Sequence, residues 1–364
     1  MPKESCLSID LRMYRMSGIG RYLQTIMPHL VPLVRAQKIQ ILGTPEDLAC
    51  ESWITDLRIE LRAFRSGIFG IGEQIAGALG RYGEADLLWV PQYNIPVLYG
   101  GKLLVSIHDV CHLAHPETLR NDIQRRYSRF LFSAVARKAT RVLCVSNFTA
   151  SEVQKYLEVD PSRLAVTYPD VVTDWGRGVL SPSGSGKAPY LLAVGNVKKH
   201  KNLQSLIRAF NIIRERIPHN LVIVGKRGGF RNSDMDLSTT FPADNRIRFT
   251  GEVSDHELAG YYREAVALIF PSIYEGFGFP LVEAMANGCP VACSDISSLP
   301  EVAAGSAMLF DPFDPQQIAE AILRIATDSE LRAELIGRGL NRARIFSTHA
   351  CAEKTAAVIN GLLD

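Results

Sequence analysis

Residues 270–286 read FPSIYEGFGFPLVEAMA, and this stretch decides the fold prediction. A buried strand is predicted to end at Pro271, a loop with two glycines follows, and Pro280 suits the first residue of a helix. Strands that alternate with helices in this way predict an α/β domain built on a parallel sheet. Ligands of such domains bind at the carboxyl ends of the strands, so the loop that follows Pro271 is a predicted ligand site.

Two glutamates stand in this stretch, Glu275 in the loop and Glu283 in the predicted first turn of the helix. Each carboxylate can accept two hydrogen bonds from a vicinal diol, and backbone amides near Gly276, Phe277 and Gly278 suit an anionic or hydroxyl-rich ligand. The helix dipole alone also favours a glutamate in a first turn, which is the alternative interpretation of Glu283. That alternative does not apply to Glu275.

The same alternation extends over all 364 residues, a length that predicts about two domains at roughly 150 residues each. We expect two Rossmann-like domains at 1–170 and 189–345, a Gly-, Ser- and Pro-containing linker at 171–188, and a C-terminal helix within 346–364 that could cross back to the first domain. Strands are predicted at 7–11, 38–42, 57–64, 86–90, 102–107 and 141–145, and then at 190–194, 220–224, 246–249, 265–270 and 290–293.

Composition excludes several classes of protein. Forty basic residues nearly balance 38 acidic ones, so nucleic acid is not an expected partner. Seven cysteines without a CxxC pair predict reduced thiols rather than disulfides or zinc ligands. No run approaches the roughly 20 apolar residues of a membrane span, and the N-terminus lacks the apolar stretch of a secretion signal, so a cytoplasmic location is predicted.

Two glycines, Gly18 and Gly20, precede the first predicted helix. They would let the backbone approach an anion at the helix N-terminus, although a tight turn without a ligand fits equally. A dinucleotide fingerprint would place a third glycine where Leu23 stands. Glu46 and Asp47, after the second predicted strand, do match the acidic position of that fingerprint. An NAD-dependent dehydrogenase is therefore an alternative, but it leaves the motif at 270–286 unexplained.

Basic residues follow the first strand of the second domain, in the segment from Gly195 and Asn196 to Lys201. Gly195 frees the backbone, while Lys198, Lys199 and Lys201 can place ammonium groups over a diphosphate. A solvated surface loop is the alternative interpretation.

A further candidate is His108-Asp109, which closes a strand of the first domain, at the edge where α/β ligands bind. A lone histidine at such a position can equally be structural. The pair Asp234 and Asp236 has the letters of a metal-binding DxD, yet it lies in a polar stretch that predicts a surface loop. We therefore predict that the protein binds no metal.

The motifs occur together in a known order: SGIGRY at 17–22, SIHDV at 106–110, VSNF at 145–148, GNVKKHKNL at 195–203, EGFGFPLVEAMANGCPV at 275–291 and SSLPEV at 297–302. In this the chain resembles the retaining GT-B glycosyltransferases of family four. The resemblance implies two Rossmann-like domains that face a central cleft. It also implies that the second domain holds a nucleotide-sugar and the first holds the acceptor.

The resemblance further implies a role for each candidate residue. Glu283 would bind the ribose, and Glu275 the transferred sugar beside the backbone of Gly276, Phe277 and Gly278. Lys201 would bind the diphosphate, with Gly18 and Gly20 closing over it, and His108 would face the sugar next to Asp109. Many relatives carry Arg where this chain has Asn196, so diphosphate neutralisation would fall to Lys201 with Lys198 or Arg227.

These expectations describe a metal-independent hexosyltransferase without a cofactor, whose substrates are a nucleoside-diphosphate sugar and a glycan or polyprenyl-linked acceptor in polysaccharide or glycolipid synthesis. The SGIGRY, SIHDV and HKNL segments resemble O-antigen mannosyltransferases, which favours GDP-mannose as donor over UDP-glucose. Two further alternatives are a sugar-nucleotide epimerase of the same architecture and a non-catalytic binding protein. The latter would be expected to lose Glu275, Lys201 or His108.

The segment from Leu119 to Arg141 is strongly basic and predicts a helix. Its arginines could bind anionic lipid headgroups or a polyprenyl diphosphate, which would place the protein at the inner face of the plasma membrane. The alternative is a solvated helix whose apolar side lies in the core of the first domain. The residues predicted for that apolar stripe are Ile123, Tyr127, Phe130, Leu131 and Val135.

Overall fold

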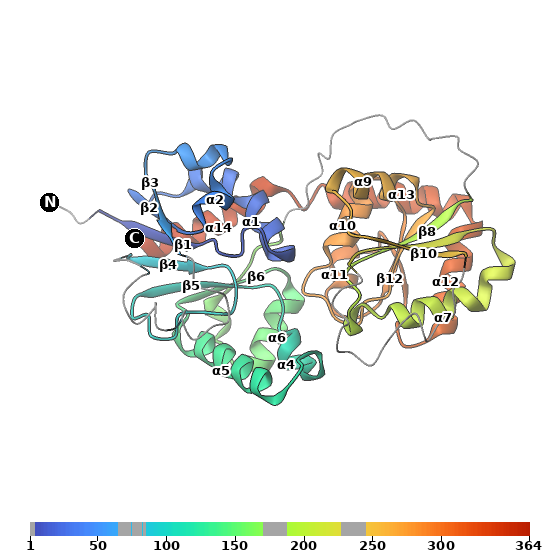
Figure 1. Cartoon of the computed structure of the whole chain (residues 1–364), viewed down its shortest axis with the longest axis horizontal. Helices are drawn as coiled ribbons and strands as arrows, with labels where there is room; N and C mark the ends of the chain where they lie inside the picture. The colour runs from blue at the N-terminus through green and yellow to red at the C-terminus, as the bar shows by residue number, and fades with distance from the viewer. Residues whose placement is uncertain (1–3, 65–73, 75–81, 83–84, 170–187, 227–244) are drawn as a thin grey trace. The chain divides into compact units, whose positions relative to one another are not determined.

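The chain divides into two compact units, Met1–Asp170 with Ser347–Asp364, and Val171–Phe346. The computed structural model describes residues 4–64, 74, 82, 85–169, 188–226 and 245–364. Of the predicted linker at 171–188, all but the last residue lie outside the described residues. Each unit is an α/β domain and is described by itself (Figure 1).

In the first unit, the described residues form a seven-stranded parallel sheet in the order β3-β2-β1-β4-β5-β6-β7. Its central strand pairs bring buried apolar residues side by side, as where Ile9 lies opposite Ile41 and Trp89. The strands are β1 Cys6–Asp10, β2 Lys38–Gly43, β3 Ile59–Ala63, β4 Leu87–Val90, β5 Lys102–Ile107, β6 Arg141–Cys144 and β7 Leu164–Val166. The α-helices in the described part of this unit are α1 Ser17–Leu30, α2 Pro45–Leu48, α4 Cys111–Ala114, α5 Asp122–Lys138, α6 Asn147–Leu157 and α14 Thr348–Leu363.

In the second unit, the described residues form a six-stranded parallel sheet in the order β10-β9-β8-β11-β12-β13. The strands are β8 Tyr190–Val194, β9 Asn220–Val224, β10 Ile247–Gly251, β11 Ala267–Phe270, β12 Val291–Ser294 and β13 Met308–Phe310. The α-helices are α7 Leu203–Ile213, α9 Asp255–Glu264, α10 Phe279–Ala286, α11 Leu299–Ala303, α12 Pro315–Thr327 and α13 Ser329–Ala343.

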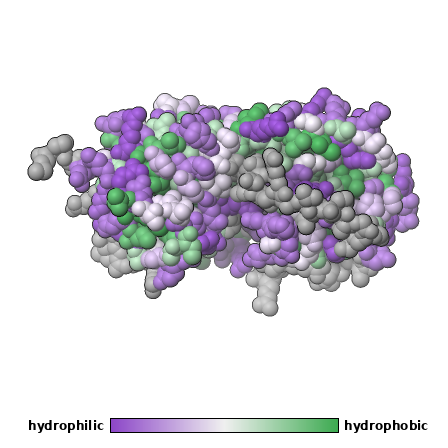
Figure 2. All heavy atoms as spheres, turned by 90° about the horizontal axis from the view of Figure 1, so that it is seen from above, coloured by the Kyte–Doolittle hydropathy of each residue, from purple (hydrophilic) through white to green (hydrophobic). Residues whose placement is uncertain are grey.

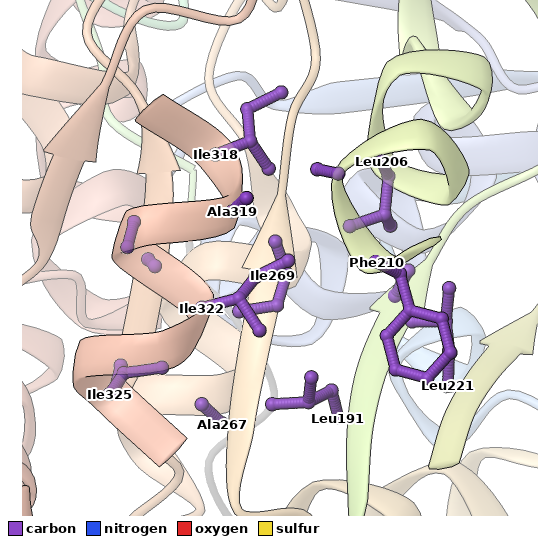
Figure 3. Packing of buried hydrophobic residues seen from close by; sticks show 14 of the residues in the cluster. Leu191, Leu206, Phe210, Leu221, Ala267, Ile269, Ile318, Ala319, Ile322 and Ile325 are labelled. Atoms are coloured by element: carbon purple, nitrogen blue, oxygen red, sulfur yellow. The ribbon is translucent and has the colours of Figure 1, made fainter. Parts of the chain in front are cut away.

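One face of the second sheet is covered by α7 and α12, which lie side by side (Figure 3). Leu206 and Phe210 of α7 and Ile322 of α12 reach the sheet at Leu191 and Ile269, and all five are buried. Burying one such side chain stabilises a fold by about 1.5–3 kcal/mol. This layer therefore fixes the strands whose carboxyl ends carry the candidate site of the second unit.

The C-terminal helix α14 belongs to the first unit, where it packs against α1 (Figure 1). Thr355 and Ile359 are fully buried, and the Asn360 side chain accepts a hydrogen bond from the amide of Arg35 at 2.8 Å and donates one to the carbonyl of Leu33 at 3.1 Å. The chain thus returns from the second unit to complete the first.

In the described parts of the chain, no helix has the length and apolarity that crossing a bilayer requires. On the face shown in Figure 2, hydrophilic residues predominate and hydrophobic ones are scattered in small groups.

The predicted apolar stripe of α5 is wrong at two positions. Leu131 and Val135 are buried as expected, but Ile123 is 78% exposed and Phe130 is 47% exposed. One residue turns an α-helix by about 100°, so Phe130 cannot share the face of its neighbour Leu131. Ile123 and Phe130 instead lie with Arg126 on the solvent side of the helix.

Candidate functional site

The loop between β11 and α10 is fixed by Gly278, which has a left-handed φ of +97° and caps the helix. A Cβ at this position would lie 2.7 Å from a methyl carbon of Leu299, so only glycine fits without a shift. The helix begins at Phe279, and Glu283 is its fifth residue. The predicted place of Glu283 in the first turn is therefore wrong, and the helix dipole does not explain this glutamate.

Glu275 forms an ion pair with Lys201, whose Nζ lies 2.5 Å from Oε1 of the carboxylate. The two side chains are only 14% and 15% exposed. Burial acts to raise the pKa of Glu275, but the nearby charges of Lys201 and His200 outweigh it and hold the pKa below its ordinary value. Glu275 is thus an ionised carboxylate, and it is paired with Lys201, the cation that was predicted to bind the diphosphate.

A backbone hydrogen bond joins the two loops that carry this pair, and a serine side chain joins the Glu275 loop to the start of α11. The amide of Ile273 donates to the carbonyl of His200 at 2.8 Å, and the carbonyl of Glu275 accepts a hydrogen bond from Ser298 Oγ at 2.9 Å. Lys201 Nζ also lies 5.1 Å from the ring centroid of Phe270, at the end of β11. The ion pair therefore stands at the carboxyl ends of β8 and β11, neighbours in the sheet.

Gly195 makes room for the Lys201 side chain. It has a φ of +145°, and a Cβ there would lie 3.3 Å from Cε of Lys201. The next residue, Asn196, accepts a hydrogen bond from the amide of Lys226 at 3.2 Å and so links the ends of β8 and β9. Lys198 is exposed, while Arg227, the other predicted phosphate cation, lies outside the described residues.

Glu283 is buried, and it accepts a hydrogen bond from a phenol. Its side chain is 1% exposed, and Oε2 accepts a hydrogen bond from the hydroxyl of Tyr262 at 2.7 Å. Tyr262 lies on α9 and is itself fully buried. Tyr262 was not predicted as a site residue, because Glu283 follows it 21 residues later, beyond β11, and no local motif marks the contact.

Aromatic packing holds the remaining predicted residues of this loop. Phe277 is 2% exposed and makes edge-to-face contacts with Phe279 and Phe346, with ring centroids 5.4 and 5.2 Å apart. Gly276, between Glu275 and Phe277, is also buried. The side chain of Phe277 thus belongs to the core, and any role in ligand binding falls to the backbone.

In the first unit, Gly18 and Gly20 lie within the first turns of α1, so their predicted place before a helix is wrong. A Cβ on Gly20 would come within 2.8 Å of the carbonyl oxygens of Met13 and Tyr14, whereas one on Gly18 would meet nothing within 4 Å. The cap residue Met16 provides no side-chain hydrogen bond, and the first turn holds no acidic residue. Only glycine therefore fits at position 20, where α1 packs closely against the backbone of the preceding loop.

His108 follows β5, and its Nε2 donates to the carbonyl of Pro91 at 3.1 Å. Burial lowers the pKa of His108, against the opposing effects of the Pro91 hydrogen bond and of Asp109. The imidazole is therefore neutral near pH 7, and its Nδ1 is left as the acceptor nitrogen. Asp109 is exposed and accepts a hydrogen bond from the amide of Cys111 at 2.8 Å, at the start of α4.

The predicted residues fall into two groups. Lys201, Glu275 and Glu283, with the loop glycines, gather at one sheet edge of the second unit, whereas Gly18, Gly20, His108 and Asp109 belong to the first. Across the described ranges, no cluster of three or more His, Cys, Asp or Glu side chains could hold a metal ion. The predicted surface pair Asp234 and Asp236 lies outside those ranges.

Comparison with known proteins defines the class. Residues 181–342 match the family described as "Glycosyl transferases group 1", and residues 44–175 match "Glycosyltransferase Family 4". The chain is 29% identical to O-antigen chain mannosyltransferase B of Escherichia coli over 70% of this chain and 69% of the relative. It is 31% identical to O-antigen chain mannosyltransferase RfbU of Salmonella typhimurium over 67% of this chain and 66% of the relative.

The structure is also similar to that of HepE from Anabaena in complex with UDP and glucose. The TM-score is 0.76, with 17% sequence identity, over 98% of this chain and all of that one. The predicted GT-B fold is confirmed. The chain belongs to the group 1 glycosyltransferases of family 4, a retaining family, and is an enzyme that transfers a sugar from a nucleotide-sugar donor.

Proposed function

We propose that this enzyme transfers mannose from GDP-mannose to a glycan or polyprenyl-linked acceptor in polysaccharide or glycolipid synthesis. Support comes from the two relatives named as O-antigen chain mannosyltransferases, at 29% and 31% identity. UDP-glucose is the alternative donor, because the HepE structure of the same fold holds UDP and glucose. The two relatives are both named as mannosyltransferases, so they give no support to the epimerase or the dehydrogenase alternative.

The observation that carries the proposal for the site is the ion pair of Lys201 with Glu275. A donor diphosphate offers Lys201 an anion that can replace the carboxylate, and the released Glu275 can then accept hydrogen bonds from the sugar hydroxyls. Lys201 would stabilise the departing diphosphate as its negative charge grows. Glu283 would bind the ribose, and the backbone of Gly276, Phe277 and Gly278 would line the sugar. No step of this scheme requires a metal.

In the first unit we assign the N-terminus of α1, with Gly18 and Gly20, to the donor phosphates. Helix N-termini favour anions, and this one has no acidic residue in its first turn. The neutral imidazole of His108 would hydrogen-bond a sugar hydroxyl without adding positive charge near an oxocarbenium-like centre. Asp109 would orient this segment through its bond to the amide of Cys111.

Calorimetric titration tests the donor site. GDP, UDP, ADP and NADH are titrated without added metal into the wild type and into Glu283→Ala. Tight binding of GDP, weakened by the substitution, is expected, followed by turnover of GDP-mannose in preference to UDP-glucose. Tight binding of UDP alone would establish the alternative donor. If no nucleoside diphosphate bound, even with magnesium, the proposed site would be wrong.

We further propose that α5 contacts an anionic membrane surface, which would place the enzyme at the inner face of the plasma membrane. The exposed side of α5 combines Ile123 and Phe130 with Arg126 and Arg129, and arginines beside exposed apolar groups suit an anionic bilayer. Arg125 instead pairs with Asp122 at 2.9 Å. Flotation with vesicles containing anionic lipid should be lost when Arg126 and Arg129 become Glu. Unchanged flotation would refute the contact.

A further inference from the structure

A buried hydrogen bond at the candidate ribose site points to a positioning residue outside the recognised motifs. Tyr262, near the end of α9, donates its hydroxyl proton to Oε2 of Glu283 at 2.7 Å, and the two side chains are 0% and 1% exposed. The helices α9 and α10 that carry them pack against each other (Figure 1). Both residues belong to the second unit, so the contact is internal to one domain.

A buried carboxylate needs hydrogen-bond donors, because burial removes the water that would otherwise solvate its charge. Tyr262 supplies such a donor on a helix fixed at both ends: Ser254 and Glu257 form a capping box at the start of α9, and the amide of Ala265 bonds the carbonyl of Tyr261 at its end. The phenol is held in place by full burial. The hydrogen bond thus ties the Glu283 carboxylate to α9.

We propose that Tyr262 positions Glu283 for recognition of the donor ribose, an inference that rests on the ribose role of Glu283 proposed above. A carboxylate has lone pairs for about four hydrogen bonds, and the Tyr262 hydroxyl occupies one of them on Oε2. Without the phenol, the carboxylate would turn toward other donors, and both hydrogen bonds to the diol would lose their geometry. Tyr262 acts through Glu283 and is not itself placed against the ligand.

The test compares a nucleoside diphosphate with its 2′,3′-dideoxy counterpart, which lacks the diol. Wild type is titrated with GDP or UDP, whichever it binds more tightly, and with the dideoxy form. The ratio of the two dissociation constants measures diol recognition. In Tyr262→Phe this ratio should fall roughly tenfold, the effect of losing about one hydrogen bond to a charged group. A purely structural role would weaken both ligands alike and leave the ratio unchanged.

The matched control is Tyr261→Phe, which removes the same hydroxyl from the adjacent residue of α9. The Tyr261 hydroxyl accepts a long hydrogen bond from Arg248 at 3.4 Å and is not bonded to Glu283. Its ratio should stay within about twofold of wild type, which is well under 1 kcal/mol. An equal ratio in wild type and Tyr262→Phe would overturn the inference. A wild-type ratio near one would overturn the ribose role of Glu283 itself, and the inference with it.

Tyr262→Phe could fail to fold, because the Glu283 carboxylate would stay buried without the phenol. A second pair of variants covers this case. Glu283→Gln removes the charge, and the combined Glu283→Gln, Tyr262→Phe variant also removes the phenol. The ratio of the two dissociation constants should be lower in the combined variant than in Glu283→Gln alone. The same ratio in both would overturn the positioning role.

Discussion

Lys201→Met is the substitution for which the structure gives the most definite energy. It removes the cation and leaves the carboxylate of Glu275, which is only 14% exposed, without its partner at 2.5 Å. Removing one partner of a buried pair destabilises a protein by about 3–5 kcal/mol. The residual exposure and the neighbouring His200 place this case near about 3 kcal/mol, or roughly a hundredfold in the unfolding equilibrium of the second unit.

Glu275→Gln and the combined variant complete a double-mutant cycle with Lys201→Met. In Glu275→Gln, the flexible stem of Lys201 can carry its ammonium group toward water, so a loss of about 1 kcal/mol is expected. The combined Lys201→Met, Glu275→Gln variant leaves no charge unpaired and should also lose only about 1 kcal/mol. The strong non-additivity, rather than any single value, reports the coupling of the two side chains.

Thiol labelling in increasing urea, read by mass spectrometry of peptides, measures each unit separately. Cys289 and Cys293 are 2% and 0% exposed in the second unit, so they react when that unit opens. Cys144 is fully buried in the first unit and should be unaffected by the substitutions. Additive losses in the combined variant, or a loss below about 1 kcal/mol in Lys201→Met, would refute the buried, coupled pair.

Three more predictions follow from the same geometry. Burial raises the pKa of Glu275, but the charges of Lys201 and His200 together outweigh burial and leave the pKa lowered. The pair's stabilisation should therefore be complete above pH 4.5 and be lost as the pH falls through the lower folded-state pKa; pH-dependent thiol labelling should show no such loss in Glu275→Gln. Glu283→Ala should weaken nucleoside diphosphate binding by about 1.5–3 kcal/mol in calorimetry, while Glu275→Ala spares affinity and reduces turnover; equal affinity losses would contradict these roles. Gly20→Ala should destabilise the first unit by about 1–3 kcal/mol in thermal unfolding, because its Cβ would meet two backbone carbonyls. Gly18→Ala, whose Cβ meets open space, should stabilise the unit by up to about 1 kcal/mol. Equal effects of the two substitutions would contradict the contact at Gly20.

The buried strands could be predicted from sequence because each is a short apolar run. Predicted and observed bounds coincide for β5, β8 and β9 and differ by one or two residues for the other predicted strands. The strands that were missed, β7 Leu164–Val166 and β13 Met308–Phe310, lie at sheet edges and have three residues each. Their residues are mostly half-buried or exposed, so no continuous apolar run marks them.

The position of the first helix was mispredicted for a different physical reason. Glycine disfavours helix interiors, so Gly18 and Gly20 predicted a loop. The structure shows that Gly20 lies where a Cβ would strike two backbone carbonyls, so tertiary packing overrides the local propensity. The motif was located correctly in the chain, but its backbone conformation depended on the loop of residues 13–16, which folds back against it.

The sequence motif places two glutamates eight residues apart, and the fold gives them different surroundings. A left-handed glycine turn at Gly278 separates a loop position from the second turn of a helix, so Glu275 meets the ammonium of Lys201 while Glu283 meets the phenol of Tyr262. Lys201 stands 74 residues before Glu275, and its loop is brought there by the pairing of β8 with β11. A cation can be drawn away from a carboxylate by a phosphate, whereas a neutral phenol has no comparable attraction to an anionic ligand. The two carboxylates are therefore suited to different tasks: the ion-paired one to a change of partner when a charged donor enters, and the phenol-bonded one to holding a fixed direction throughout.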